Sequence, residues 1–262
     1  MFASAWRHRL LVGQLIQREI LGRYKGSVFG LLWSLINPLI LLAVYTFVFS
    51  FVFKTRWNSG SDSKTEFALV LFAGLIIHGF LSECINRAPY QILNNPSYVK
   101  KVVFPLETLS WVTLLSTLFH ALVSLVVWLI FFAALHHFMH YTLVFLPLVL
   151  LPLLFYALGL SWFLASLGVY LRDVSQITGI FSTLLLFMSP IFYPLSSIPD
   201  KYQNYLYLNP LTSIIEQARG VMMWGKPPDW VELSITLTVS LLVAWGGFAW
   251  FQKTRRGFAD VI

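Results

Sequence analysis

Six long, mainly apolar stretches alternate with shorter polar segments along this chain. They cover residues 28–53, 67–85, 109–135, 141–171, 177–193 and 231–251. A helix needs about 20 apolar residues to cross the hydrocarbon core of a bilayer, so each stretch predicts a membrane span, although the second and fifth are short for a crossing. An even number of spans places both ends of the chain on one side. The pattern predicts an all-α integral membrane protein with six transmembrane helices in a single domain over residues 1–262.

The segment before the first span, residues 1–27, predicts a helix that lies in the cytoplasmic membrane interface. Its apolar face carries Val12, Leu15, Ile16 and Ile20 at helical spacing, and arginines and glutamines lie opposite. Such a helix buries its apolar face at the headgroup boundary while its arginines meet anionic headgroups. The alternative is a basic flank that only sets the orientation of the first span.

Residues 195–229, between the fifth and sixth spans, are too long for a simple connection. Asn209-Pro210 is typical of a helix start, and an apolar stripe follows it. The stripe comprises Leu211, Ile214, Ile215, Ala218 and Met222. We expect short re-entrant helices that dip into the outer leaflet, and the alternative is a helix that lies flat on it. Glu216 and Arg219 form an i,i+3 pair on the opposite face.

The loop after the second span predicts a short amphipathic helix over residues 94–104. Asn94-Asn95-Pro96-Ser97 is a turn and helix-start sequence, and Pro105 ends the segment. The residues alone leave two interpretations open, a docking element for a partner and an ordinary connecting helix.

Composition excludes the other structural classes. Apolar residues make up 58% of the chain and charged residues only 11%. That balance is far from the one typical of a soluble domain. High hydrophobicity with few charges also excludes a disordered chain. The single cysteine, Cys84, excludes a disulfide scaffold.

The net charge of +7 lies on one side of the predicted membrane. The side that holds both termini and the loops after spans two and four carries twelve basic and five acidic residues, whereas the other side carries six of each. Basic residues concentrate in cytoplasmic loops, so both termini are predicted to be cytoplasmic. The sorting accounts for the whole charge, and no nucleic-acid partner is needed to explain it.

Chemical motifs are few. The chain has no GxxxxGK[ST] phosphate loop, so ATP and magnesium for any powered transport would be bound by another chain, and no cofactor is expected here. No span carries an acid near its centre, as ion-coupled carriers usually do. His136, His137 and His140 are interpreted as a polar turn rather than a metal site. His78 and His120 are interpreted as packed histidines, with a pore-lining role as the alternative.

Aromatic residues make up 17% of the chain and cluster beside prolines within two of the spans. The predicted conduit residues are Trp33, Asn37, Tyr45, Phe187, Phe192 and Tyr193. Aromatic faces stack on the C–H faces of sugar rings, so an uncharged aromatic conduit suits a sliding glycan. The alternative for each aromatic residue is packing against lipid or the protein core.

Five segments, in order, resemble a known family. Residues 18–39 read REILGRYKGSVFGLLWSLINPL, which is similar to the opening of ABC-2 type permeases that export O-antigen, capsule or teichoic acid. Four later segments also resemble that family in the same order. They are NNPSYVKK at 94–101 with FPLE at 104–107, YLRDV at 170–174, SPIFYP at 189–194 and LNPL at 208–211. The resemblance covers nearly the full chain.

The resemblance implies an assembly of two permease copies and two ATPase subunits in the bacterial inner membrane. The coupling helix that docks on the ATPase would include Asn94, Pro96, Tyr98, Lys100, Lys101 and Phe104. The first and fifth spans of both copies would line the conduit, and residues 195–229 would form periplasmic gate helices among the membrane lipids. The cargo would be an undecaprenyl-diphosphate-linked glycan, O-antigen above all.

Three basic residues near the cytoplasmic ends of the spans suit the diphosphate of such a cargo. Arg23, Lys25 and Arg172 are the predicted contacts, because cationic donors pair well with phosphate oxygens. A topogenic role is the alternative for each. Two other functions remain open at this point: an ABC-2 exporter of drugs or lipids, and a membrane enzyme that acts on polyprenyl-linked sugars. The enzyme lacks support, because no acidic pair or metal constellation lies near the spans, so a transport permease is predicted.

Overall fold

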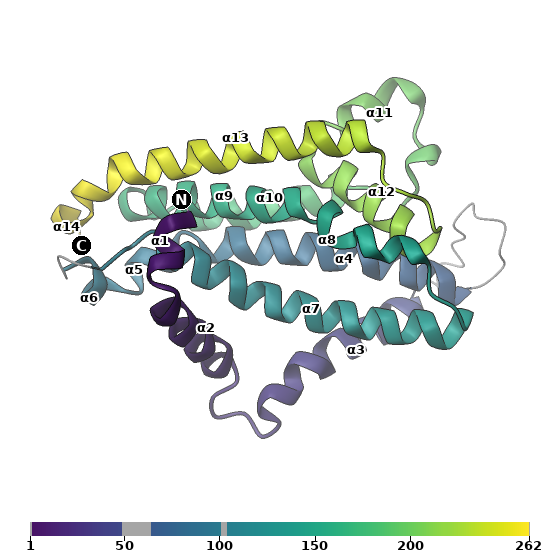
Figure 1. The fold of residues 1–262 in the computed structure, drawn as a ribbon, viewed down its shortest axis with the longest axis horizontal. Coiled ribbons are helices and arrows are strands. Elements are labelled where there is room, and N and C mark those ends of the chain that lie inside the picture. Colours follow the sequence, from purple (N-terminus) through teal and green to yellow (C-terminus); the bar gives the residue numbers. More distant parts are fainter. Residues whose placement is uncertain (1, 49–63, 101–103, 262) are drawn as a thin grey trace.

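A computed structural model describes residues 2–48, 64–100 and 104–261, and these residues form helices and no strands (Figure 1). The helices of the first half are α1 (Phe2–Arg7), α2 (Arg9–Arg23), η1 (Gly30–Leu32), α3 (Trp33–Phe47), α4 (Lys64–Arg87), α5 (Tyr90–Leu93), α6 (Pro96–Val99) and α7 (Thr108–His136). Those of the second half are η3 (Tyr141–Phe145), α8 (Leu146–Val149), α9 (Leu151–Tyr170), α10 (Val174–Met188), η4 (Leu195–Ser197), α11 (Asp200–Leu206), α12 (Pro210–Met223), α13 (Trp230–Thr254), η5 (Arg255–Gly257) and α14 (Phe258–Val261).

Five helical stretches among the described residues are long and apolar enough to cross a membrane. They are Gly30–Phe47, Glu66–Arg87, Thr108–His136, Tyr141–Tyr170 and Trp230–Val261, and α10 is a shorter apolar helix. The prediction of an all-helical protein with several membrane spans is confirmed. Helix α10 is only four turns long, so it rises about 22 Å, less than the roughly 30 Å of a bilayer core.

Prolines explain where the observed helices depart from the predicted spans. The fifth helix covers 174–188 instead of 177–193, because Pro190 has no N–H to donate and forces Ser189 into an extended conformation. The fourth stretch is broken into η3, α8 and α9, with Pro147 and Pro152 at the starts of the latter two. In the first stretch α3 covers Trp33–Phe47, and residues 49–53 lie outside the described part of the chain.

Helix α4 forms the centre of the bundle. Residues 67–73 are each at most 3% exposed, so its N-terminal half is covered on every side, as its all-round apolar sequence requires. Trp128 of α7 packs against it, and the indole Nε1 of Trp128 donates to the Leu69 carbonyl at 2.9 Å. The buried indole therefore keeps a hydrogen-bond partner and ties α7 to α4.

Helices α9 and α13 lie along each other for most of their length (Figure 1). Their contact is built on Gly159 and Gly247, whose backbones approach so closely that a Cβ at 247 would lie 2.1 Å from the Gly159 carbonyl oxygen. Small residues permit such an approach between membrane helices. The two glycines thus determine how the last span packs on the bundle.

Both termini lie at the same end of the long axis (Figure 1). The Glu107 carboxylate joins them, because it accepts a hydrogen bond from Ser4 at 2.7 Å and pairs with Arg255 at 3.2 Å. Helices α11 and α12 lie at the opposite end of the molecule. The positions agree with the prediction that both termini share one side.

The N-terminal segment forms α1 and α2. Val12 and Leu15 are buried against Val112 of α7, so part of the predicted apolar face packs on the bundle. Trp6 of α1 and Leu10 of α2 remain largely exposed, by 73% and 79%. The segment therefore has an apolar contact with the protein and separate apolar side chains turned outward.

Candidate functional site

A cavity of about 590 Å³ lies between α3, α4 and α7, close to the end of α2. Polar side chains line much of it, although these helices are otherwise apolar. The polar lining residues are Arg23, Tyr24, Ser34, Asn37, Tyr45, His78, Glu83, Thr117, His120 and Ser124. Hydroxyl, amide and imidazole groups donate and accept hydrogen bonds without carrying a fixed charge. The lining therefore combines apolar side chains with groups that can bond a hydroxyl-bearing cargo or water.

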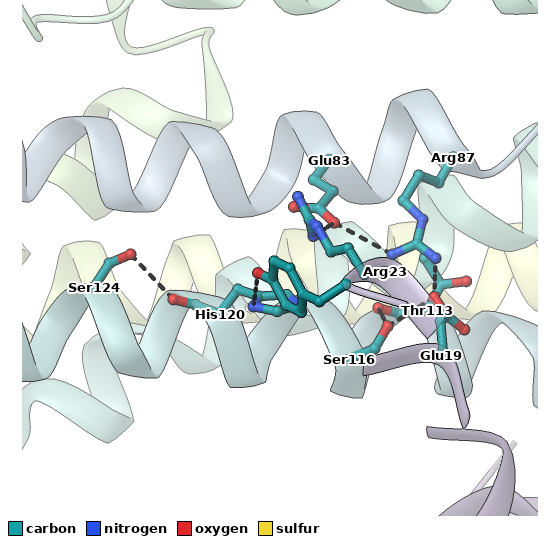
Figure 2. Close-up of polar contacts among 9 residues, drawn as sticks. Glu19, Arg23, Glu83, Arg87, Thr113, Ser116, His120 and Ser124 are labelled. Atoms are coloured by element: carbon teal, nitrogen blue, oxygen red, sulfur yellow. Dashed lines mark hydrogen bonds and ion pairs between the residues drawn. The ribbon is translucent and has the colours of Figure 1, made fainter. Parts of the chain in front are cut away.

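A chain of ion pairs lies beside this cavity, at the end near α2 (Figure 2). Glu83 of α4 pairs with Arg23 at 2.6 Å and with Arg87 at 3.2 Å. Arg87 also pairs with Glu19 of α2, whose carboxylate accepts a hydrogen bond from Ser116 of α7 at 2.9 Å. The chain links α2, α4 and α7 at the level where α2 leads toward the first span.

Tyr24 continues this chain into the cavity. Its hydroxyl lies 3.3 Å from Nδ1 of His120, and the two rings meet edge to face. Burial raises the pKa of the Tyr24 phenol, so the hydroxyl stays neutral at physiological pH. His120 is thus packed against a neighbouring segment and also lines the cavity. The sequence had left packing and pore lining as two separate interpretations for this residue.

The six predicted conduit residues fall into three groups. Asn37 and Tyr45 line the cavity. Trp33 lies at the start of α3, where it packs edge to face on Phe29. Phe187 and Phe192 lie 5.9 Å apart at the end of α10, and the Tyr193 hydroxyl donates to the Phe187 carbonyl at 3.1 Å. The structure of one chain therefore brings two of the six to the cavity and gathers three at the C-terminal end of α10.

Asn37 has a polar side chain on an otherwise apolar helix. It is exposed within the isolated chain, and its amide has no hydrogen bond in the described part of the chain. Polar side chains within membrane helices are costly unless they face a polar partner or a water-filled cavity. The position of Asn37 on the cavity wall supplies such a setting.

The predicted coupling segment contains a helix shorter than 94–104. Helix α6 covers only Pro96–Val99; Asn95 precedes it without a capping hydrogen bond from its side chain, and Lys100 follows it. Asn94, Pro96 and Lys100 are exposed. Lys101 lies outside the described residues.

Two aromatic residues of the coupling segment point inward rather than outward. The rings of Tyr98 and Phe104 stack at 4.2 Å and pack against Val12, Leu15 and Val112. They hold α2 in place, so a partner would meet chiefly the exposed polar residues of the segment.

The three predicted diphosphate contacts differ in their surroundings. Arg23 is neutralised in part by Glu83. Lys25 and Arg172 are exposed, and neither has an ion pair in the part of the chain that the structure describes. Lys25 and Arg172 are therefore better placed than Arg23 to meet an added anion.

The histidines of the sequence have structural partners. Nε2 of His78 donates to the Ser182 carbonyl of α10 at 2.9 Å, which confirms a packed histidine bonded to a neighbouring helix. His137 ends α7 in a left-handed conformation with φ of 58°, and His140 donates to the Met223 carbonyl at 3.1 Å. The described residues contain no group of histidines and acids that could hold a metal. The 136–140 cluster is thus a turn, and His140 bonds it to the end of α12.

Arg219 of α12 is a key residue whose burial the sequence did not reveal. The apolar stripe of α12 is buried as predicted, but Arg219, assigned to the opposite polar face, has an exposure of 0%. Its Nε donates to the Val70 carbonyl at 3.0 Å, Nη2 donates to the Ile191 carbonyl at 3.0 Å, and Nη1 contacts Pro190. The guanidinium therefore connects α12 to α4 and to the turn after α10.

The charge of Arg219 is retained in this setting. Burial lowers the pKa of Arg219 to about 10, and nearby Glu216, 3.3 Å away, opposes that shift. Gly74 makes room for the guanidinium, because a Cβ there would lie 2.9 Å from Nη2. A single arginine among apolar neighbours and a glycine on α4 were the only signals in the sequence.

Comparison with known proteins identifies the family. Residues 11–223 match the model of the ABC-2 type transporter family. The chain is 29% identical to the O-antigen export system permease protein of Myxococcus xanthus, over 98% of this chain and 97% of that one. It is 25% identical to an O-antigen export system permease protein of Klebsiella pneumoniae (95% and 93%) and 26% identical to the polysialic acid transport protein of Escherichia coli (93% of each). The chain therefore belongs to the ABC-2 type transporter family, as its ordered motifs indicated, and is a membrane transport subunit rather than an enzyme.

Proposed function

We propose that this chain is the membrane subunit of an exporter that moves a lipid-linked polysaccharide, O-antigen above all, across the bacterial inner membrane. The supporting observation is similarity along nearly the whole chain to permeases of O-antigen and polysialic acid export. The cavity lined by hydroxyl, amide and imidazole groups agrees with a glycan cargo, because such groups bond sugar hydroxyls. An ABC-2 permease works with an ATPase partner, and that partner would bind the ATP and magnesium.

In this proposal two copies of the chain pair with two ATPase subunits. Helices α3 and α10 of both copies line the conduit, and the aromatic group at the end of α10 guides the glycan at its outer side. Helices α11 and α12 form re-entrant gate helices in the outer leaflet, and α2 lies in the cytoplasmic interface. Lys25 and Arg172 meet the diphosphate of the cargo, with Arg23 shared between cargo and Glu83.

Deletion of the gene, followed by analysis of surface and intracellular glycan, tests the proposal. We expect loss of surface polysaccharide and accumulation of lipid-linked polymer inside the cell, because synthesis continues without export. Complementation with the wild-type gene restores the surface polymer and serves as the control. Unchanged surface polysaccharide with altered drug sensitivity or lipid distribution would favour an ABC-2 exporter of another cargo.

Asn37→Leu tests the role of the cavity. We expect export to fall about tenfold while the protein level in the membrane is unchanged, because the amide bonds cargo or water rather than another protein group, and a lost hydrogen bond of about 1.4 kcal/mol corresponds to a factor of ten. Ile130→Leu, on an exposed face of α7 outside the cavity lining, is the control. Wild-type export by Asn37→Leu would remove the cavity from the cargo path.

Lys100→Glu tests the coupling segment. Lys100 is exposed beside α6, so reversal of its charge should weaken a contact with the ATPase without disturbing the fold. We expect less ATPase to copurify with the variant and export to fall in proportion, measured against Lys226→Glu at the opposite end of the molecule. Equal copurification of the ATPase with both variants would exclude Lys100 from the docking surface.

A further inference from the structure

A second cavity, of about 440 Å³, lies at the end of the molecule that holds both termini. Helix α2 forms one wall, and the end of α4 together with α5 and the start of α7 forms the others. Its polar lining residues are Arg18, Glu19, Asn86, Arg87, Tyr90, Gln91, Asn94, Asn95 and Thr113. Arg87 and Glu19 belong to the ion-pair chain of Figure 2, which separates this cavity from the one in the bundle.

The charges around this cavity favour an anion. Arg18 makes no hydrogen bond or ion pair within the described part of the chain, so its guanidinium is available. Arg87 is already held by Glu19 and Glu83, so Arg18 supplies the unpaired positive charge at this cavity. A guanidinium offers paired N–H donors that match the oxygens of a phosphate group.

The cavity wall also holds buried amides that are incompletely bonded. Gln91 is only 7% exposed; its Oε1 accepts from Ser110 at 2.9 Å, but its Nε2 has no partner among the described residues. Oδ1 of Asn86 is likewise without a partner in that part of the chain. Buried polar atoms without partners are costly, so a small rotation of either side chain toward a ligand with acceptors and donors in the cavity would stabilise this wall. A phosphate ester with hydroxyl groups has both.

The surroundings indicate where that phosphate comes from. Trp6, Leu10 and Leu21 of α1 and α2 are exposed, whereas Val12 and Leu15 pack on α7. Exposed tryptophan and leucine beside arginines are typical of a helix at the headgroup boundary. The cavity behind α2 would then open at the depth of lipid phosphates.

We propose that this cavity binds the headgroup of an anionic phospholipid, with Arg18 holding the phosphate and Gln91 lying behind it. A lipid headgroup and free phosphate would both present a phosphate group to Arg18. We choose a membrane lipid as the source, because the exposed apolar residues of α2 suit the headgroup boundary. Asn94 and Asn95 line the same cavity just before α6, so an occupied site would brace the segment proposed to meet the ATPase. The proposal does not depend on which cargo is exported.

The test uses the complete permease–ATPase complex, delipidated in detergent. Phosphatidylglycerol, phosphatidylcholine and inorganic phosphate are added separately, and the unfolding midpoint and the bound lipid, counted by native mass spectrometry, are recorded. We expect phosphatidylglycerol to be retained and to raise the midpoint of the wild type. Arg18→Gln should weaken this binding about tenfold, because a charge-assisted hydrogen bond is lost.

Arg7→Gln is the matched control, since Arg7 is an exposed arginine on α1 outside the cavity lining. Gln91→Asn is a second variant that shortens the donor while keeping the amide, and it should also weaken retention. Equal loss of phosphatidylglycerol in Arg18→Gln and Arg7→Gln would overturn the site in favour of a general surface charge. Stabilisation by inorganic phosphate with no preference for phosphatidylglycerol would overturn the lipid as the source.

Discussion

Gly247→Val is expected to push α13 away from α9 and to leave little correctly folded permease in the membrane. A Cβ at position 247 would lie 2.1 Å from the carbonyl oxygen of Gly159, and a Cβ at 159 would in turn lie 2.5 Å from the Val243 carbonyl. These neighbours are backbone atoms, which cannot rotate away as a side chain can. Overpacking of this kind costs about 1–3 kcal/mol or more, and the measurement is the yield and unfolding midpoint of the purified complex.

Gly246→Val is a closely matched control for this prediction. It makes the same change one residue earlier on the same helix, where a Cβ would meet nothing within 4 Å. Helix propensity changes equally in both variants, so any difference between them reports the contact with α9. Similar midpoints for the two variants would show that α9 and α13 do not pack through these glycines.

Arg219→Met is expected to produce the second large effect, a loss of stability with detachment of α12 from the bundle. Methionine has similar length but no donors, so the carbonyls of Val70 and Ile191 would lose their partner. Removing one side of a buried charged network typically costs about 3–5 kcal/mol. The unfolding midpoint of the complex should fall by more than in Arg219→Lys. Lysine keeps the charge but lacks the planar guanidinium and its several N–H donors.

Lys226→Met serves as the control, because Lys226 is an exposed cation shortly after the end of α12. Accessibility of a cysteine introduced at Ser189, which is buried in the turn after α10, provides a readout beyond stability. We expect faster labelling of that cysteine in the Arg219→Met background, since the guanidinium no longer holds the turn to α12. A midpoint and labelling rate equal to those of the wild type would contradict the connecting role of Arg219.

Local pattern accounts for much of the fold. The apolar stretches predicted where membrane helices lie, because burial of the backbone in lipid requires helix wherever a long apolar run occurs. The stripe from Leu211 to Met222 was identified by spacing alone and is buried as expected. Span ends were less predictable, since Pro190 ends α10 earlier than its apolar run ends.

The site depended on contacts between distant segments. Asn37 and Tyr45 were recognised as polar or aromatic groups within an apolar helix, but their meeting with His120 and Ser124 of α7 requires the packing of three helices. Tyr98 and Phe104 were assigned to a docking surface, whereas their rings stack inward on α2. Sequence spacing does not distinguish an aromatic side chain that meets a partner from one that packs within its own chain.

The sequence by itself determined the all-helical membrane class and, through its ordered motifs, the family, and it predicts that the net charge of +7 lies on the side that holds both termini. These properties depend on composition and on residues close together in the chain. Only the tertiary structure decided that Arg219 is buried, that Glu83 neutralises Arg23, and that Gly247 and not Gly246 carries a helix contact. The physical reason is that burial, ion pairing and close approach depend on which helix faces which, and that arrangement is a property of the whole packed bundle.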